Sequence, residues 1–212
     1  MTQPTLNHET LLDWLDAQQD QMVALLGDLV NIDSNSFDKA GVDRVADRLA
    51  KFFDEQSIQH ETIPIATHGD AMRAVVAGGN GNRPILLCGH RDTVFPTGEV
   101  EKRPFELRDG KAYGPGVADM KPGLVINAFI LAAFQKFGGH PNPLVGLFTG
   151  DEEIGSPTSQ DVIIAEAKKA RLAFNSEPSR PNGNIVTKRK GGIFCHCDIH
   201  GVAAHSGGFF EE

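Results

Sequence analysis

The chain has 212 residues, of which 40% are hydrophobic and 23% are charged, and its formal net charge at pH 7 is −8. This length is enough for at least one domain with a full hydrophobic core. No apolar run approaches the roughly 20 residues of a membrane span, and no basic cluster is longer than Lys188-Arg189-Lys190. The start, Met1-Thr2-Gln3-Pro4, lacks the basic and apolar regions of a signal peptide. We therefore expect a cytoplasmic protein that binds neither membranes nor nucleic acid.

The three cysteines, Cys88, Cys195 and Cys197, are expected to be free thiols because their number is odd and the chain has the features of an intracellular protein. The segment Cys195-His196-Cys197-Asp198-Ile199-His200 is similar to a metal-binding cluster. In a strand, however, its two cysteines would lie on one face and its histidines on the other. We therefore favour a strand without a metal for this segment.

The first part of the chain is predicted to be helical. Apolar residues recur at helical intervals over 11–30 and again over 42–53. The first stretch predicts one long amphipathic helix, frayed around 18–21, and the second stretch predicts another helix. The segment 32–36 between them has the composition of a turn, and both helices are expected to pack on a sheet.

Two strands, over residues 57–65 and 71–77, are predicted to precede a central strand that begins at Ile85. The glycine-rich segment Gly78-Gly79-Asn80-Gly81-Asn82 is interpreted as a plain turn. A phosphate-binding loop would open a helix, whereas Pro84 and an apolar strand follow these glycines.

Three apolar runs each end in chemically active side chains. The run that starts at Ile85 ends in His90 and Asp92, the run over 144–149 leads into Asp151-Glu152-Glu153, and the run over 172–175 leads into Glu177. Open α/β sheets bind their ligands at the carboxyl ends of parallel strands. If the three strands are neighbours, a histidine and several carboxylates meet there, and a divalent metal would relieve their repulsion.

The remaining elements alternate between helix and strand. They are a loop over 95–103, a hairpin with its turn at Asp109-Gly110, a buried helix over 124–137 with Pro122 in its first turn, and a helix over 160–170. Asp119 precedes the buried helix, where it is either a helix cap or a metal ligand. This order predicts an α/β fold with a central, mostly parallel sheet and helices on both faces.

The character of the chain changes after Pro178. Residues 179–184 are linker-like, and 185–190 and 193–199 alternate as antiparallel strands do. We expect residues 1–184 to belong to one α/β domain and residues 185–212 to begin a small α+β domain that is incomplete at Glu212.

Nitrogen and oxygen ligands without thiolate suit zinc, and also cobalt or manganese, and Asp119 is a natural bridge between two ions. Adjacent Glu152 and Glu153 cannot point the same way from an extended strand, so one would bind metal while the other serves as general base. A metal ligand beside a free glutamate is an arrangement that hydrolyses amides, because the metal lowers the pKa of a water towards about 7 and the glutamate takes its proton. The alternative interpretation of this acidic segment is a solvated loop.

Five motifs together resemble the glutamate carboxypeptidase and aminoacylase family of di-zinc metallopeptidases and deacylases. They are His90-Arg91-Asp92-Thr93-Val94, Ala118-Asp119-Met120-Lys121-Pro122-Gly123, Gly150-Asp151-Glu152-Glu153-Ile154-Gly155-Ser156, Ser176-Glu177-Pro178-Ser179 and Gly201-Val202-Ala203-Ala204-His205-Ser206-Gly207. The resemblance implies a catalytic domain of the zinc exopeptidase type, interrupted by a lid domain that forms homodimers. Residues 1–184 would be the N-terminal part of that catalytic domain, and residues 185–212 the beginning of the lid.

The resemblance also implies a ligand set for two zinc ions. His90 would bind one zinc ion, Asp119 would bridge both, Glu153 would bind the other, and Glu177 would complete the first site. Cobalt or manganese would be possible substitutes for zinc.

Catalytic roles follow from the same resemblance. Asp92 would orient His90, Glu152 would be the general base, and His205 from the lid would stabilise the oxyanion, in some members across a dimer. The peptide bond between Asp119 and Met120 would be cis.

The expected reaction is hydrolysis of an amide next to a free carboxylate, as in glutamate carboxypeptidases, with a small peptide or N-acyl amino acid as substrate. The alternatives are an N-acyl amino acid deacylase, of the acetylornithine deacetylase or succinyl-diaminopimelate desuccinylase type, and a non-catalytic binding or dimerisation module. The family's last zinc-binding histidine and its carboxylate-binding residues would follow Glu212. We therefore expect the 212-residue chain to be an inactive fragment of a longer enzyme.

Overall fold

The structure is a computed structural model, and it describes residues 7–79, 82–180, 182–188, 190–193, 195–198, 200–201 and 207. The chain divides into two compact units, Met1–Pro178 and Ser179–Glu212. Described residues between 182 and 200 form no strand, in contrast to the two strands predicted there. An alternating pattern yields a strand only where another strand pairs with its backbone, and no such pairing occurs among the described residues. The domain boundary after residue 184 stays a prediction.

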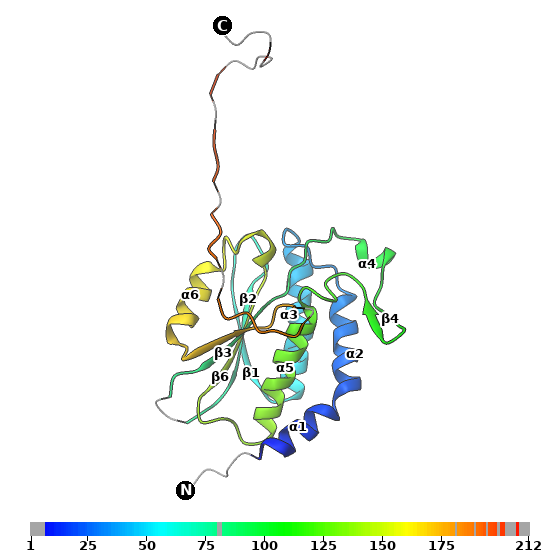
Figure 1. Ribbon diagram of the computed structural model, residues 1–212, viewed down its shortest axis with the longest axis vertical. Helices are drawn as coiled ribbons and strands as arrows, with labels where there is room; N and C mark the ends of the chain where they lie inside the picture. The colour runs from blue at the N-terminus through cyan, green and yellow to red at the C-terminus, as the bar shows by residue number, and fades with distance from the viewer. Residues whose placement is uncertain are drawn as a thin grey trace. The chain divides into compact units, whose positions relative to one another are not determined.

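A five-stranded sheet forms the centre of the first unit (Figure 1). Its strands, in spatial order, are β1 (Gln59–Ile63), β2 (Ala71–Val76), β6 (Leu144–Thr149), β3 (Ile85–His90) and β7 (Leu172–Asn175). Strands β6, β3 and β7 are parallel, whereas β2 is antiparallel to both β6 and β1. The predicted, mostly parallel sheet is thereby confirmed. Because β6, β3 and β7 are parallel neighbours, their carboxyl ends lie at the same edge.

The helices agree with the sequence prediction except at two places. They are α1 (His8–Asp16), α2 (Gln19–Val30), α3 (Lys39–Glu55), α4 (Glu99–Lys102), α5 (Lys121–Lys136) and α6 (Gln160–Lys169). The single helix predicted over 11–30 is wrong, because the chain breaks between α1 and α2. The residues around the break are polar apart from Ala17, so no apolar stripe continues through it, and each half packs on α5. Helix α4 lies within the predicted loop 95–103.

Two smaller elements complete the first unit. Strands β4 (Glu106–Arg108) and β5 (Lys111–Tyr113) form the predicted hairpin, with positive φ at both turn residues, Asp109 and Gly110. A 3₁₀ helix, η1 (Glu152–Ile154), follows β6. Within the described chain, no helix combines the length and apolarity that a membrane crossing requires.

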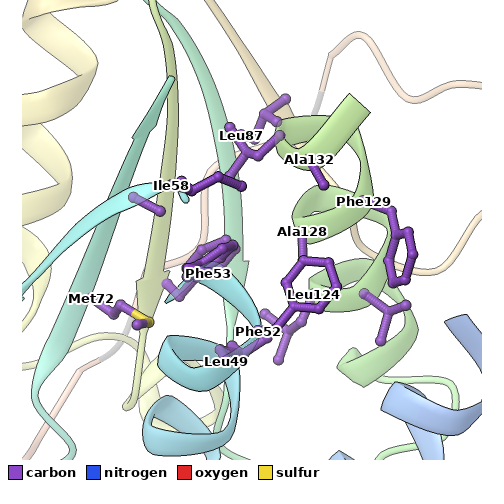
Figure 2. Close-up of a cluster of buried hydrophobic side chains, with 14 of the residues drawn as sticks. Leu49, Phe52, Phe53, Ile58, Met72, Leu87, Leu124, Ala128, Phe129 and Ala132 are labelled. Carbon is purple, nitrogen blue, oxygen red and sulfur yellow. The ribbon is translucent and has the colours of Figure 1, made fainter. Parts of the chain in front are cut away.

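Helices cover both faces of the sheet, as predicted: α6 lies on one face and α3 and α5 lie on the other (Figure 1). Alternate residues of β3 point to opposite faces, so Leu87 belongs to the core under α3 and α5, whereas Leu86 belongs to the core under α6. The larger core contains Phe53 (Figure 2). The ring of Phe53 is stacked on that of Phe148, with ring centroids 6.0 Å apart.

We expect Phe53→Ala to destabilise the protein by about 3–5 kcal/mol, because a fully buried ring is removed and a cavity remains. The control is Phe37→Ala, since Phe37 is 75% exposed and its loss should change stability by about 0.5 kcal/mol or less. Urea unfolding followed by circular dichroism measures both values. Similar losses for the two variants would contradict the described core.

Candidate metal centre

His90 is the last residue of β3, and its side chain is almost fully buried. Its Nδ1 donates to the backbone oxygen of Asp92 at 3.0 Å and lies 3.2 Å from Oδ1 of the same residue. Its backbone N–H donates to Sδ of Met120 at 3.2 Å. These contacts fix the ring so that Nε2 points away from Asp92, and this buried Nε2 has no hydrogen-bond partner among the described residues.

Three carboxylates face that nitrogen. Nε2 lies 3.3 Å from Oδ1 of Asp119, 3.5 Å from Oε1 of Glu177 and 3.7 Å from Oε2 of Glu152. His90, Asp119 and Glu177 offer ligand atoms that lie within 4.8 Å of one another, and they are the one such group in the part of the chain that the structure describes. A buried imidazole nitrogen without a partner, together with carboxylate oxygens, fits a zinc ion.

The pKa values of Glu177 and His90 are both raised within this cluster. Burial and the charges of Asp119 and Glu152 raise the pKa of Glu177 to about 7, against the opposing effect of His90. Burial tends to lower the pKa of His90, but the hydrogen bond to Asp92 and the surrounding carboxylates raise it to about 9. A bound cation would reduce the repulsion among these carboxylates.

Asp119 lies in the loop immediately before α5, as the sequence predicted. The residue at the helix cap position is Met120, whose side chain makes no capping hydrogen bond. Asp119 is therefore not a helix cap, and its half-exposed carboxylate is free to face His90. The Asp119–Met120 peptide bond is cis, as the family resemblance implied.

Glu177 is held near the cluster by the close approach of α5 to the end of β7. A Cβ at Gly123 would lie 2.2 Å from the backbone oxygen of Ser176, so only glycine fits at this contact. Asn127 of α5 accepts from Oγ of Ser176 at 2.7 Å and donates to the backbone oxygen of Cys88 at 3.0 Å. These contacts connect α5, β3 and the residue before Glu177.

Glu152 and Glu153 lie in the 3₁₀ helix η1, which corrects the assumption that they extend a strand. The turn arises because Asp151, buried, accepts hydrogen bonds from Thr158 and Ser159 and so bends the chain after β6. Glu152 faces His90, as described above. Glu153 does not belong to the group formed by His90, Asp119 and Glu177. Burial and nearby carboxylates, including that of Asp119, raise the pKa of Glu153, so its carboxyl group interacts electrostatically with the same cluster.

Asp92 connects these parts of the site. Its carboxylate accepts the backbone N–H of Glu152 at 3.2 Å and of Glu153 at 3.1 Å, and the hydroxyl of Ser36 at 2.6 Å. Burial tends to raise the pKa of Asp92, but His90, Ser36 and the backbone donor lower it overall. Asp92 is therefore a buried carboxylate anion that holds His90 and the η1 turn in place.

The sequence analysis missed buried polar residues near the site, Ser36 and Lys121 among them. Ser36 belongs to the segment interpreted only as a turn. Lys121, at the start of α5, donates from Nζ to the backbone oxygens of Leu29 and Ile32, both at 2.8 Å, and burial lowers its pKa to about 7. No local pattern indicates either contact, because the partners are far away in the sequence.

Other predicted residues lie away from the cluster or outside the description. His205 falls outside the described residues. Cys88, Cys195 and Cys197 are free, as expected. His196 contacts Asp198 at 3.0 Å in an exposed segment, and this pair is not part of any metal-ligand group among the described residues.

A family model described as peptidase family M20/M25/M40 matches residues 86–205, which is more than half of the chain. The chain belongs to this family. The resemblance inferred from the five motifs is thereby confirmed. Carboxypeptidase G2 from Pseudomonas sp. (strain RS-16) is 31% identical over 198 residues, which are 90% of this M20 chain and 46% of the relative. The chain thus spans less than half the length of that curated relative.

Solved structures agree with this M20 fold. Human carnosine dipeptidase 1 superimposes with a TM-score of 0.69 at 18% identity, over 81% of this chain and 41% of that one. The M20 family metallo-carboxypeptidase Sso-CP2 from Sulfolobus solfataricus gives a TM-score of 0.66 at 20% identity, over 78% of this chain and 39% of that one. At these identities, the likeness establishes the fold.

Adding Zn²⁺ to the metal-free protein should raise its melting temperature. A ligand that binds only the folded state stabilises it by about 2.7 kcal/mol at 100 times its Kd. Glu177→Gln should lose most of this rise because it removes a candidate ligand, whereas Glu55→Gln, at the exposed end of α3, should keep it. Thermal melts with and without Zn²⁺ measure the difference. An equal rise in both variants would exclude Glu177 as a ligand.

Proposed function

We propose that this M20 chain belongs to a metal-dependent hydrolase that cleaves an amide bond next to a free carboxylate, of the glutamate carboxypeptidase type. The observation that carries the proposal is the buried Nε2 of His90, which lacks a hydrogen-bond partner among the described residues and lies within 3.7 Å of three carboxylates. The 31% identity to carboxypeptidase G2 supports a peptide-like substrate. In this proposal, residues 1–184 are part of the catalytic domain and residues 185–212 begin a lid.

His90, Asp119 and Glu177 would hold one ion, and Asp119 and Glu153 would contribute to a second. Zinc fits this set of nitrogen and oxygen donors, and cobalt or manganese would be substitutes. When bound, the metal would lower the pKa of the attacking water towards about 7. The half-exposed carboxylate of Asp119 leaves that side of the cluster open to a substrate.

Glu152 would act as the general base. Its carboxylate is about half exposed, and its Oε2 lies 3.7 Å from Nε2 of His90, so it can accept a proton from a water beside the cluster. Its backbone N–H is bound to Asp92, the residue that also contacts Nδ1 of His90. Asp92 would therefore keep the base and the metal ligand at a constant separation, as positioning requires.

Substrate assays test the reaction class. The full-length protein should hydrolyse N-acyl glutamates or small peptides with a free carboxylate when supplied with Zn²⁺ or Co²⁺. Faster turnover of N-acetyl or N-succinyl amino acids would favour the deacylase alternative, and metal binding without turnover of any substrate would favour a non-catalytic module. Homodimer formation and a cytoplasmic location stay predictions from the sequence.

Glu152 and Glu153 should have separable roles. Glu152→Gln should keep its zinc content but lower kcat by about 10²–10⁴-fold, the contribution of a general base. Glu153→Gln should lose zinc as well as activity. Zinc analysis and steady-state kinetics of both full-length variants measure this. Zinc loss in Glu152→Gln alone would reverse the two assignments, and identical behaviour of the variants would overturn them.

His205→Ala should lower kcat far more than it lowers zinc content, because an oxyanion donor acts in the transition state. The matched control is His196→Ala, which changes an exposed histidine outside the cluster and should leave both quantities unchanged. The same zinc and kinetic measurements decide this. Zinc loss in His205→Ala would instead identify His205 as a ligand.

A further inference from the structure

Ser36 lies in the loop between α2 and α3, and its side chain is buried beside the end of β3. Several contacts fix the loop there. Among them, the backbone oxygen of Ser34 accepts from the N–H of Thr93 at 2.8 Å, and Nδ2 of Asn35 donates to the backbone oxygen of Phe95 at 3.1 Å. Ser36 is 2% exposed, and its Oγ donates to Oδ2 of Asp92 at 2.6 Å. The hydroxyl is therefore held in place and shielded from solvent.

Oδ2 of Asp92, the oxygen that Ser36 binds, also contacts the η1 turn. Oδ2 of Asp92 also accepts the N–H of Glu153, whereas Oδ1 accepts the N–H of Glu152 and faces Nδ1 of His90. Rotation of the Asp92 carboxylate would disturb all three contacts together. Ser36 is the one side-chain hydroxyl that donates to this carboxylate among the described residues, so it opposes that rotation.

We propose that Ser36 is a positioning residue for the metal centre. Its hydroxyl fixes the Asp92 carboxylate, and Asp92 in turn fixes the ring of His90 and the turn that carries Glu152. This inference rests on the proposed function, because it assumes that His90 binds metal. Partners that orient metal ligands typically change metal affinity 10–100-fold when they are removed. Ser36 acts through one further residue, so we expect a loss of about tenfold, at the lower end of that range.

The chain supplies a matched control two positions away. Ser34 is also 2% exposed and lies in the same loop, but its Oγ has no hydrogen-bond partner among the described residues. Ser34→Ala therefore removes a buried hydroxyl without removing a contact to Asp92. Any effect that both variants share comes from the loop, and any effect of Ser36→Ala alone comes from its hydrogen bond.

The experiment titrates the metal-free 212-residue chain and its variants with Co²⁺ and records visible absorption, which reports both affinity and ligand geometry. Ser36→Ala should bind Co²⁺ about tenfold more weakly, with a changed absorption band, whereas Ser34→Ala should match the unsubstituted protein. Ser36→Thr keeps the hydroxyl and should restore the affinity. Equal affinities for Ser36→Ala and Ser34→Ala would overturn the proposal.

Two further measurements keep the test decisive. If Ser36→Ala does not fold, Ser36→Cys takes its place, because a thiol is a weaker donor of similar size and should give a smaller loss in the same direction. If the unsubstituted chain and the full-length protein both bind no Co²⁺, the proposed function fails and this inference fails with it. If they bind Co²⁺ but Ser36→Cys or Ser36→Ala is indistinguishable from Ser34→Ala, only the inference fails.

Discussion

The site depends on the burial of one negative charge, the carboxylate of Asp92. A buried carboxylate costs several kcal/mol unless hydrogen bonds compensate it. The compensating donors come from three segments that are far apart in the sequence: Ser36, His90, and the backbone of Glu152 and Glu153. The burial of Asp92 therefore goes together with the meeting of these segments. The hydrogen bonds that compensate the burial of the Asp92 carboxylate therefore also bring together residues of the candidate metal centre.

Burial divides the site into two parts with different tasks. Asp92 and the ring of His90 are almost completely buried, so their positions are determined by the fold. Asp119 and Glu152 are about half exposed, so they remain open to water and, in the proposed hydrolase, would be open to a substrate. A hydrolase needs both properties, because its ligands must be held rigidly while the reacting groups must be reached. The negative charge that gathers at the exposed side is costly without a cation, which supports the proposed metal site.

Family membership and local geometry support the proposal independently. The match to peptidase family M20/M25/M40 rests on sequence, and the likeness to carnosine dipeptidase 1 rests on the course of the backbone at 18% identity. Neither comparison uses the distances around Nε2 of His90. Those distances show that the side chains of His90, Asp119 and Glu177 actually meet in this chain. Family membership alone does not establish that these three side chains lie together.

The sequence by itself determined the features that arise from local signals. The apolar run ending in His90, the helix start at Pro122 and the motif containing Asp119 could be recognised because strand, helix and turn preferences act over a few residues. Only the tertiary structure decided that Ser36 binds Asp92 and that Lys121 is buried against the end of α2. It also decided that Glu152 and Glu153 form a turn. These outcomes depend on which distant groups folding brings next to a buried charge, and no local pattern in the chain encodes that pairing.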